Sequence, residues 1–308
     1  MQYRDIFLLS WRRADRQVCS GNWAEPDSFR LRIFIFEGLN MANIKQERVQ
    51  VVSNTPVGTA YFRIRVRCQD RYTQATPGQF VMVRLIDLID PLLPRPFSIH
   101  RLIKNDGVAS GIELLYKVVG KGTHELSLRQ PGDYLDLTGP LGNGFTIPAK
   151  VGQIKIAAGG IGVAPMMFLV EYLKEQTRDP ADVQVFLGGR SKADLLCLEE
   201  FSALGVAVHT TTDDGSSGEH CLVTDPLEYA VAEDKPDIIY ACGPLEMLAC
   251  VAGIADKHRV SCQVSIETMM ACGMGACLGC AVVRRNHTDT YLHACLDGPV
   301  FDTKTLKI

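Results

Sequence analysis

The residues with the clearest chemical pattern are four cysteines near the C-terminus of the chain. Cys272, Cys277 and Cys280 have the spacing C-x4-C-x2-C, and Cys295 follows after fourteen further residues. Glycines lie between these thiols, and glycine allows a backbone to turn tightly and to direct its N–H groups at sulfur atoms. The spacing therefore predicts a metal centre with these four cysteines as ligands.

The same spacing favours one kind of metal centre. The first three cysteines have the spacing of plant-type 2Fe–2S ferredoxins. Structural zinc sites more often combine two separate cysteine knuckles, and this segment contains only one. The chain has eleven cysteines in all, most of them scattered, which fits a reducing compartment in which clustered thiols bind metal. We expect a 2Fe–2S cluster, with a zinc site, a disulfide pair or unused thiols as the alternatives.

A second group of candidate residues begins with the tetrapeptide Arg95, Pro96, Phe97 and Ser98, which follows two further prolines. An arginine in a stiff, extended segment suits a pyrophosphate, because its planar guanidinium forms charge-assisted hydrogen bonds. Phe97 can flank a ring system, and Ser98 can donate a hydrogen bond to it. The alternative is a proline-rich strand with an arginine on the surface.

Two nearby segments strengthen this interpretation. Gly122 and Thr123 open a predicted helix, and the free N–H groups of a helix N-terminus bind anions. The tripeptide Leu115, Tyr116 and Lys117 offers a ring for stacking and a positive charge. Together the three segments predict a dinucleotide site.

A third group lies further along the chain, where the segments 159–165 and 242–244 each follow an apolar run. Segment 159–165 is rich in glycine and opens a predicted helix, so its N–H groups can approach a phosphate. The alternative for this segment is a tight turn without a ligand, and the alternative for Cys242 is a small buried thiol. The candidate residues are Gly159, Gly160, Gly162, Cys242, Gly243 and Pro244.

Short β-branched and aromatic runs separated by turn residues must position the tetrapeptide, and they predict an antiparallel β-barrel. A helix over 124–129, capped by Thr123, is expected to interrupt it. The expected strands cover 49–52, 60–68, 79–86, 97–102, 112–118 and 134–137.

Strand-like and helical runs alternate in the next part of the chain, which predicts a parallel sheet covered by helices with its ligand at the carboxyl ends of the strands. The expected strands cover 154–158, 183–187, 206–211, 238–241 and 262–266, and the expected helices cover 162–177, 192–204, 222–232 and 244–257. A hairpin over 281–285 and 290–293 is expected to follow the cysteines.

These expectations define the fold class as α+β and α/β, with several domains. We expect an extension over 1–46, an antiparallel barrel over 47–149, a parallel-sheet nucleotide-binding domain over 150–266 and a cluster-binding region over 267–308. Patterned sequence begins only after Met41, so we expect either that the protein starts at residue 41 or that the preceding residues are a disordered tail. The alternative for these residues is a partner-docking arm.

Several classes of function are disfavoured. The net charge is −3 and no basic patch is present, which argues against nucleic acid as a partner. The longest apolar run, 156–170, is interrupted by glycines and is too short to span a membrane. Serine-hydrolase, zinc-protease and P-loop motifs are missing, the histidines lack metal-ligand spacing, and His100 is expected to serve packing.

The order of these parts resembles the electron-transfer subunit of type B dihydroorotate dehydrogenase, in the ferredoxin–NADP reductase superfamily. The resemblance covers about residues 47–308, and the cysteine spacing is its most specific part. It implies FAD in the barrel, held by the segments 95–98, 115–117 and 122–123, and NAD(H) at the segments 159–162 and 242–244. Phe97 stands where the wider superfamily has a tyrosine, so a hydroxyl is missing beside the flavin.

The resemblance also implies a function. Electrons would pass from NADH through FAD and the 2Fe–2S cluster to the FMN of a separate catalytic subunit, which interconverts dihydroorotate and orotate in pyrimidine (UMP) biosynthesis. It implies a cytoplasmic heterotetramer with two copies of each subunit, and no acid–base residue in this chain. Arg190 and Lys192 fit either a contact with the 2′-phosphate of NADPH or an ordinary charged surface.

Two other functions remain open from the sequence. One is the flavin subunit of a ferredoxin–NADP reductase or sulfide dehydrogenase complex, a group that often replaces one cluster cysteine where this chain keeps all four. The other is a non-catalytic interaction module that binds zinc on a degenerate reductase scaffold.

Overall fold

The computed structural model describes residues 45–176, 179–285 and 287–308. The described residues all belong to one compact unit. The extension over 1–46, apart from its last two residues, and the expected start at Met41 lie outside the described residues. Within the described residues, no helix is both long enough and apolar enough to cross a membrane.

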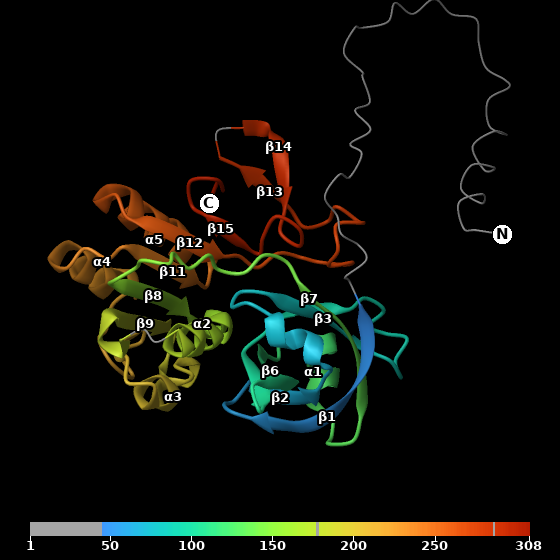
Figure 1. The fold of residues 1–308 in the computed structure, drawn as a ribbon. Helices are drawn as coiled ribbons and strands as arrows, with labels where there is room; N and C mark the ends of the chain where they lie inside the picture. The colour runs from blue at the N-terminus through green and yellow to red at the C-terminus, as the bar shows by residue number, and fades with distance from the viewer. Residues whose placement is uncertain (1–44, 177–178, 286) are drawn as a thin grey trace, which may run out of the picture. The chain divides into compact units, whose positions relative to one another are not determined.

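The first sheet is a seven-stranded antiparallel sheet with the strand order β4-β3-β7-β1-β2-β6-β5, and Figure 1 shows that it curls into a barrel. On β2, Ile64 and Val66 are buried while Arg65 and Arg67 are exposed, as the alternating sequence predicts. The strands are β1 (Gln46–Pro56), β2 (Tyr61–Arg67), β3 (Phe80–Leu85), β4 (Arg95–Ser98), β5 (Arg101–Asn105), β6 (Val108–Lys117) and β7 (Tyr134–Leu141).

The prediction of one strand over 97–102 is wrong, because the chain changes partners there. β4 pairs with β3, whereas β5 pairs with β6 at the opposite end of the sheet order. Ile99 and His100 form the crossing: the N–H of Ile99 donates to Gln79 O, and the N–H of His100 donates to Glu113 O.

The predicted helix over 124–129 is also displaced. Helix α1 covers Lys121–Ser127, with Gly120 as its N-cap. Glycine has no side chain to cap with, so Thr123 Oγ1 accepts from the N–H groups of Val119 and Gly120, at 2.9 and 3.2 Å. Thr123 therefore lies inside the first turn instead of before it.

The second sheet has the order β10-β9-β8-β11-β12-β15. Its first five strands are parallel, as predicted, and β15 is antiparallel to β12. The strands are β8 (Ile154–Gly159), β9 (Val183–Gly189), β10 (Ala207–Thr212), β11 (Ile238–Cys242), β12 (Ser261–Ser265) and β15 (Val300–Asp302), and the helices are α2 (Val163–Glu175), α3 (Leu198–Ala203), α4 (Thr224–Glu233) and α5 (Leu245–His258).

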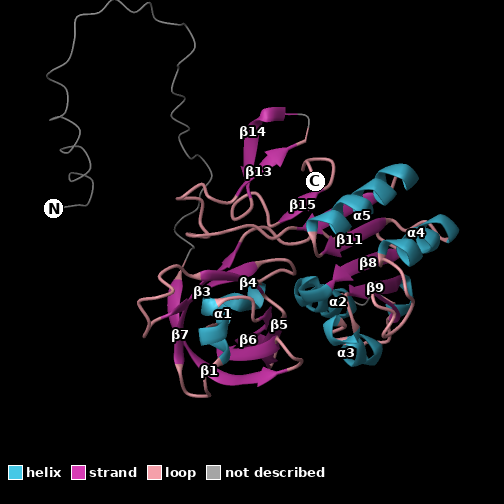
Figure 2. Ribbon diagram, turned by 180° about the vertical axis from the view of Figure 1, so that it is seen from behind, coloured by secondary structure: helices cyan, strands magenta, loops and turns pink. Residues whose placement is uncertain are grey.

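Helices cover both faces of this sheet (Figure 2). Residues of α2 and α3 share a buried cluster with Ile156 and Tyr240, whereas residues of α4 and α5 share another with Ala157 and Ile239. Neighbouring strand residues point to opposite faces, so each pair of helices protects one face from water. The predicted parallel sheet covered by helices is confirmed.

Two details of this sheet were not expected. The predicted helix over 192–204 divides into a 3-10 turn, η5 (Lys192–Asp194), and α3, because Cys197 between them has a left-handed backbone with φ +63°. The C-terminal region also returns to the sheet: after the expected hairpin, β13 (Ala281–Arg284) and β14 (His287–His293), strand β15 pairs with β12. Domain boundaries at 149/150 and 266/267 stay a prediction.

Because β15 joins the cysteine region to the parallel sheet, we expect Phe301→Ala to destabilise the protein by about 3–5 kcal/mol. Phe301 is 5% exposed and its ring lies against Gly298. Tyr291→Ala, at a residue that is 60% exposed, is the control and should cost about 1 kcal/mol or less. Urea unfolding of both variants measures the difference, and equal losses would contradict this role of β15.

Candidate functional site

The four predicted cysteine ligands lie together in a loop and in the turn after β14. The loop directs backbone N–H groups at sulfur, as expected: Gly275 N lies 3.1 Å from Cys295 Sγ, and Cys277 N lies 3.4 Å from Cys272 Sγ. Positive φ at Gly273 and Gly275 allows this path.

The thiols form two pairs. Cys280 Sγ lies 3.2 Å from Cys295 Sγ, and both residues are buried. Cys277 is exposed, and hydrogen bonds with the backbone of Gly279 and with Cys272 lower its pKa to about 7. Among the described residues, no three Cys, His, Asp or Glu side chains are arranged around a single metal ion. Two thiol pairs with N–H groups directed at their sulfurs fit a two-iron cluster, in which each iron takes two protein ligands.

The cysteine loop lies against the barrel. A Cβ atom on Gly273 would lie 2.5 Å from Met82 Cγ, so the loop backbone contacts the Met82 side chain of β3. Met82 is also the partner of Pro96 in the β3–β4 ladder. One residue therefore separates the cysteine loop from the predicted flavin segment.

The structure brings together residues of the first and third predicted flavin segments. A Cβ atom on Gly122 would lie 3.4 Å from Arg95 Nε, so the arginine side chain lies along the start of α1. Arg95 Nη1 donates to Leu93 O at 2.8 Å and to Pro94 O at 3.3 Å, which holds its guanidinium near the strand. Arg95, Phe97 and Gly122 line one pocket together with Val83, Leu85, Pro91, Leu93 and Leu126.

The aromatic residues of these segments have unequal exposure. Phe97 is half-buried and meets Tyr116 edge to face, with ring centroids 5.7 Å apart. Tyr116 is 1% exposed, stacks on Phe62 and donates its hydroxyl to Asn54 Oδ1 at 3.1 Å. In this structure Phe97, and not Tyr116, is therefore the ring that lines the pocket.

Leu115 and Lys117 lie away from that pocket. Leu115 is buried in the cluster shared with α2 and α3. Lys117 Nζ lies 3.4 Å from Asp194 Oδ1 and 4.8 Å from the centre of the Tyr61 ring, so Asp194 is its partner here. Their assignment to flavin binding stays a prediction.

The two predicted nucleotide segments lie side by side at the carboxyl ends of neighbouring strands. β8 and β11 are adjacent, and the strand order reverses between them, which is where ligands bind in open α/β sheets. A Cβ atom on Gly162 would lie 2.2 Å from Cys242 O, and one on Gly159 would lie 2.8 Å from Pro244 Cδ. Glycine at these positions therefore allows two loop backbones to touch.

The Cys242 thiol stays protonated at neutral pH. Burial raises its pKa to about 12, and Glu267 acts in the same direction, whereas a hydrogen bond with Ser265 opposes the shift. A neutral thiol at the edge of this site can pack beside an uncharged ring, but it is a poor nucleophile.

Sequence reasoning missed two residues that support these segments. Asn54 Nδ2 donates to the carbonyls of Leu126, Ser127 and Arg129 and so holds the end of α1. Met82 joins the cysteine loop to β4, as described above. No local motif marks either residue, because each acts through contacts between distant parts of the chain.

Comparisons with known proteins agree with this geometry. Residues 267–307 match the model of the iron-sulfur cluster binding domain of dihydroorotate dehydrogenase B, and residues 156–253 match that of the oxidoreductase NAD-binding domain. The solved structure of an NADH-dependent reduced ferredoxin-NADP oxidoreductase is 28% identical, with a TM-score of 0.72, and the match covers 84% of this chain and 89% of that one. A ferredoxin reductase of carbazole 1,9a-dioxygenase has a TM-score of 0.60 at 23% identity, over 70% of this chain and 66% of that one, which shows the fold alone.

Curated relatives are more similar in sequence. A dihydroorotate dehydrogenase B (NAD(+)) electron transfer subunit from Desulforamulus reducens is 42% identical over 228 residues, which cover 74% of this chain and 85% of the relative. The subunit of the same name from Caldanaerobacter subterraneus is 37% identical, over 82% of this chain and 95% of the relative. The chain therefore belongs to the family of dihydroorotate dehydrogenase B electron transfer subunits.

Proposed function

We propose that this protein transfers electrons from NADH through FAD and a 2Fe–2S cluster to the FMN of a dihydroorotate dehydrogenase catalytic subunit, in pyrimidine (UMP) biosynthesis. The observation that carries the proposal is the position of Met82, which pairs with Pro96 of the flavin segment and contacts Gly273 of the cysteine loop. When bound, FAD would accept a hydride from NADH, leaving NAD⁺, and the cluster would accept the electrons singly.

The chain's own residues hold and orient these groups. Arg95 and the start of α1 at Gly122 would bind the FAD pyrophosphate, because a guanidinium beside free backbone N–H groups suits that anion. Phe97 would lie against the flavin and Ser98 would hydrogen-bond to it. Thr123 keeps the start of α1 in place through its contacts with Val119 and Gly120.

NADH would bind across the edge formed by β8 and β11. Gly159, Gly160 and Gly162 would receive the pyrophosphate, and the segment 242–244 would lie beside the nicotinamide. We propose NADH over NADPH because the relatives are named as NAD(+) subunits.

The exposed side of the cysteine loop would meet the catalytic subunit. Residues 276–279 are exposed, Leu278 is 53% exposed and Met269 is 90% exposed. Met270 and Met274 in the same segment are half-buried. We further propose an assembly of two copies of each subunit, in the cytoplasm.

One rival function, the flavin subunit of a ferredoxin–NADP reductase or sulfide dehydrogenase complex, has a specific observation in its favour. The structural likeness to the ferredoxin-NADP oxidoreductase covers most of both chains. Affinity purification of the protein from its native cells separates the two proposals. Recovery of an FMN protein that oxidises dihydroorotate supports the main one, whereas recovery of a different redox subunit supports the rival.

We expect Cys277→Ser to damage the cluster and to block electron delivery to the catalytic subunit, because serine replaces a thiolate ligand. Reduction of an artificial dye by NADH should continue, because that reaction needs only the flavin. Steady-state assays with dye and with the reconstituted partner measure both activities. Normal electron delivery to the partner would refute the assigned route.

We expect Gly162→Ala to slow flavin reduction by NADH about 100-fold, because the new methyl group would collide with Cys242 O and push the two loops apart. Reduction of the cluster by dithionite should be unchanged. Gly253→Ala is the matched control, because a Cβ placed there would meet no atom within 4 Å beyond the adjacent backbone of its own helix. Rapid-mixing absorbance measures the rate of flavin reduction by NADH in both variants. Equal rates in the two variants would contradict the assignment of Gly162 to the nucleotide site.

A further inference from the structure

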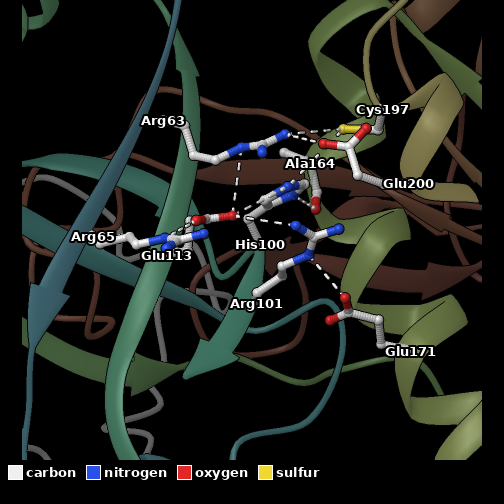
Figure 3. A network of polar contacts seen from close by, with 9 residues as sticks. All are labelled: Arg63, Arg65, His100, Arg101, Glu113, Ala164, Glu171, Cys197 and Glu200. Atoms are coloured by element: carbon white, nitrogen blue, oxygen red, sulfur yellow. Dashed lines mark hydrogen bonds and ion pairs between the residues drawn. The ribbon is translucent and has the colours of Figure 1, made fainter. Parts of the chain in front are cut away.

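A network of charged residues lies where the barrel packs on α2 and α3 (Figure 3). At its centre is Glu113 of β6, which is 0% exposed. The sheet register places Glu113 opposite Arg65 of β2 and opposite Arg101 of β5. Glu113 Oε2 lies 2.5 Å from Arg65 Nε, and its Oε1 lies 3.4 Å from Arg63 Nε and 3.7 Å from Arg101 Nη1.

Three contacts extend from this centre to the helices of the parallel sheet. Arg63 Nη2 lies 2.6 Å from Glu200 Oε1 of α3, and Arg101 Nε lies 2.8 Å from Glu171 Oε1 of α2. His100 Nδ1 donates to the carbonyl of Ala164, in the first turn of α2, at 2.8 Å. Figure 3 shows these side chains reaching from the barrel strands toward the two helices.

The network is balanced in charge. Three guanidinium groups face three carboxylates, and His100 between them is neutral because burial lowers its pKa to about 3. A buried carboxylate is tolerated only where nearby charges compensate it. Glu113 Oε2 accepts a hydrogen bond from Arg65, whereas Oε1 is compensated by the charges of Arg63 and Arg101 without a hydrogen bond. Glu171 and Glu200 on the helices offset the remaining positive charge of the arginines.

The two ends of this network adjoin the two proposed cofactor segments. His100 and Arg101 follow the flavin segment, which ends at Ser98. Ala164 follows the glycine loop 159–162, at the start of α2. A shift of α2 relative to β5 would therefore move the nucleotide site relative to the flavin site.

We propose that Glu113, Arg63, Arg101 and His100 are positioning residues for hydride transfer. The two arginines hold α2 and α3 through Glu171 and Glu200, and His100 holds the first turn of α2 through the Ala164 carbonyl, so that the nucleotide loop stays at a fixed distance from the flavin segment. This inference rests on the proposed function and extends it. These residues touch neither reacting group; they act through α2, α3 and β4. A purely structural role would affect the stability of the fold but not the rate of a reaction at saturating nucleotide.

The test uses Glu171→Gln and Glu200→Gln in the FAD-loaded full chain. Their side chains are 28% and 30% exposed, so both variants should fold, whereas Glu113→Gln changes a fully buried group. The control is Glu228→Gln, which removes an ion pair of 2.5 Å with Lys257 between α4 and α5. Thermal unfolding and FAD content are measured for all variants.

Each test variant should lower the limiting rate constant of flavin reduction at saturating NADH by about tenfold or more, because small displacements of reacting groups cost large factors in rate. The dissociation constant of NADH should change by less than about twofold, since the loops that bind it are intact. Combining Arg101→Gln with Glu171→Gln should have no more effect than Arg101→Gln alone, because Arg101→Gln already removes the contact with Glu171.

Hydrogen exchange provides a readout that does not depend on activity. Amides of β5 and of the first turns of α2 should exchange faster in Glu171→Gln than in the wild type or in Glu228→Gln. Unchanged exchange would show that the Arg101–Glu171 contact does not hold α2 against β5, and it would refute the proposal whatever the reaction rates. If NADH reduces the wild type and the variants have the same limiting rate constant of flavin reduction, the positioning role alone is refuted. If NADH cannot reduce the flavin of the wild type, the proposed function is refuted. Hydrogen exchange would still show whether the ion pairs hold α2 against β5.

Discussion

The arrangement of this protein depends on the buried carboxylate of Glu113. Transfer of a charge out of water costs several kcal/mol, and the loss of one partner from a buried pair costs about 3–5 kcal/mol. Three arginines share this one carboxylate, and two of them also reach carboxylates on α2 and α3. The antiparallel barrel and the parallel sheet are therefore joined by a network whose charges balance only when both are in place.

Close contacts made by glycine determine how near the proposed cofactor sites can lie. Gly162 allows the loop after β8 to touch the loop after β11, and Gly273 allows the cysteine loop to touch Met82. At both positions a side chain would press on a neighbour. The sites for nucleotide, flavin and cluster are thus brought close by backbone contacts, while the ion pairs hold the surrounding elements in register.

Much of this site could be predicted from the sequence, because its signals are local. The cysteine spacing, the glycine loop at 159–162 and the alternation along β2 each depend on neighbouring residues. The change of strand partner at Ile99 and the left-handed backbone of Cys197 were missed, because both depend on distant contacts. The same holds for Glu113, which is an ordinary strand residue until the register brings three arginines around it.

The proposed function requires that electrons pass from NADH through this chain to the cysteine cluster. The most direct test mixes the FAD- and cluster-loaded protein with NADH without oxygen, freezes samples at increasing times and records electron paramagnetic resonance. If the flavin passes its electrons to the cluster, the signal of a reduced 2Fe–2S cluster grows as the flavin absorbance recovers from its initial loss. A cluster that dithionite reduces but that stays silent after NADH has reduced the flavin would contradict it.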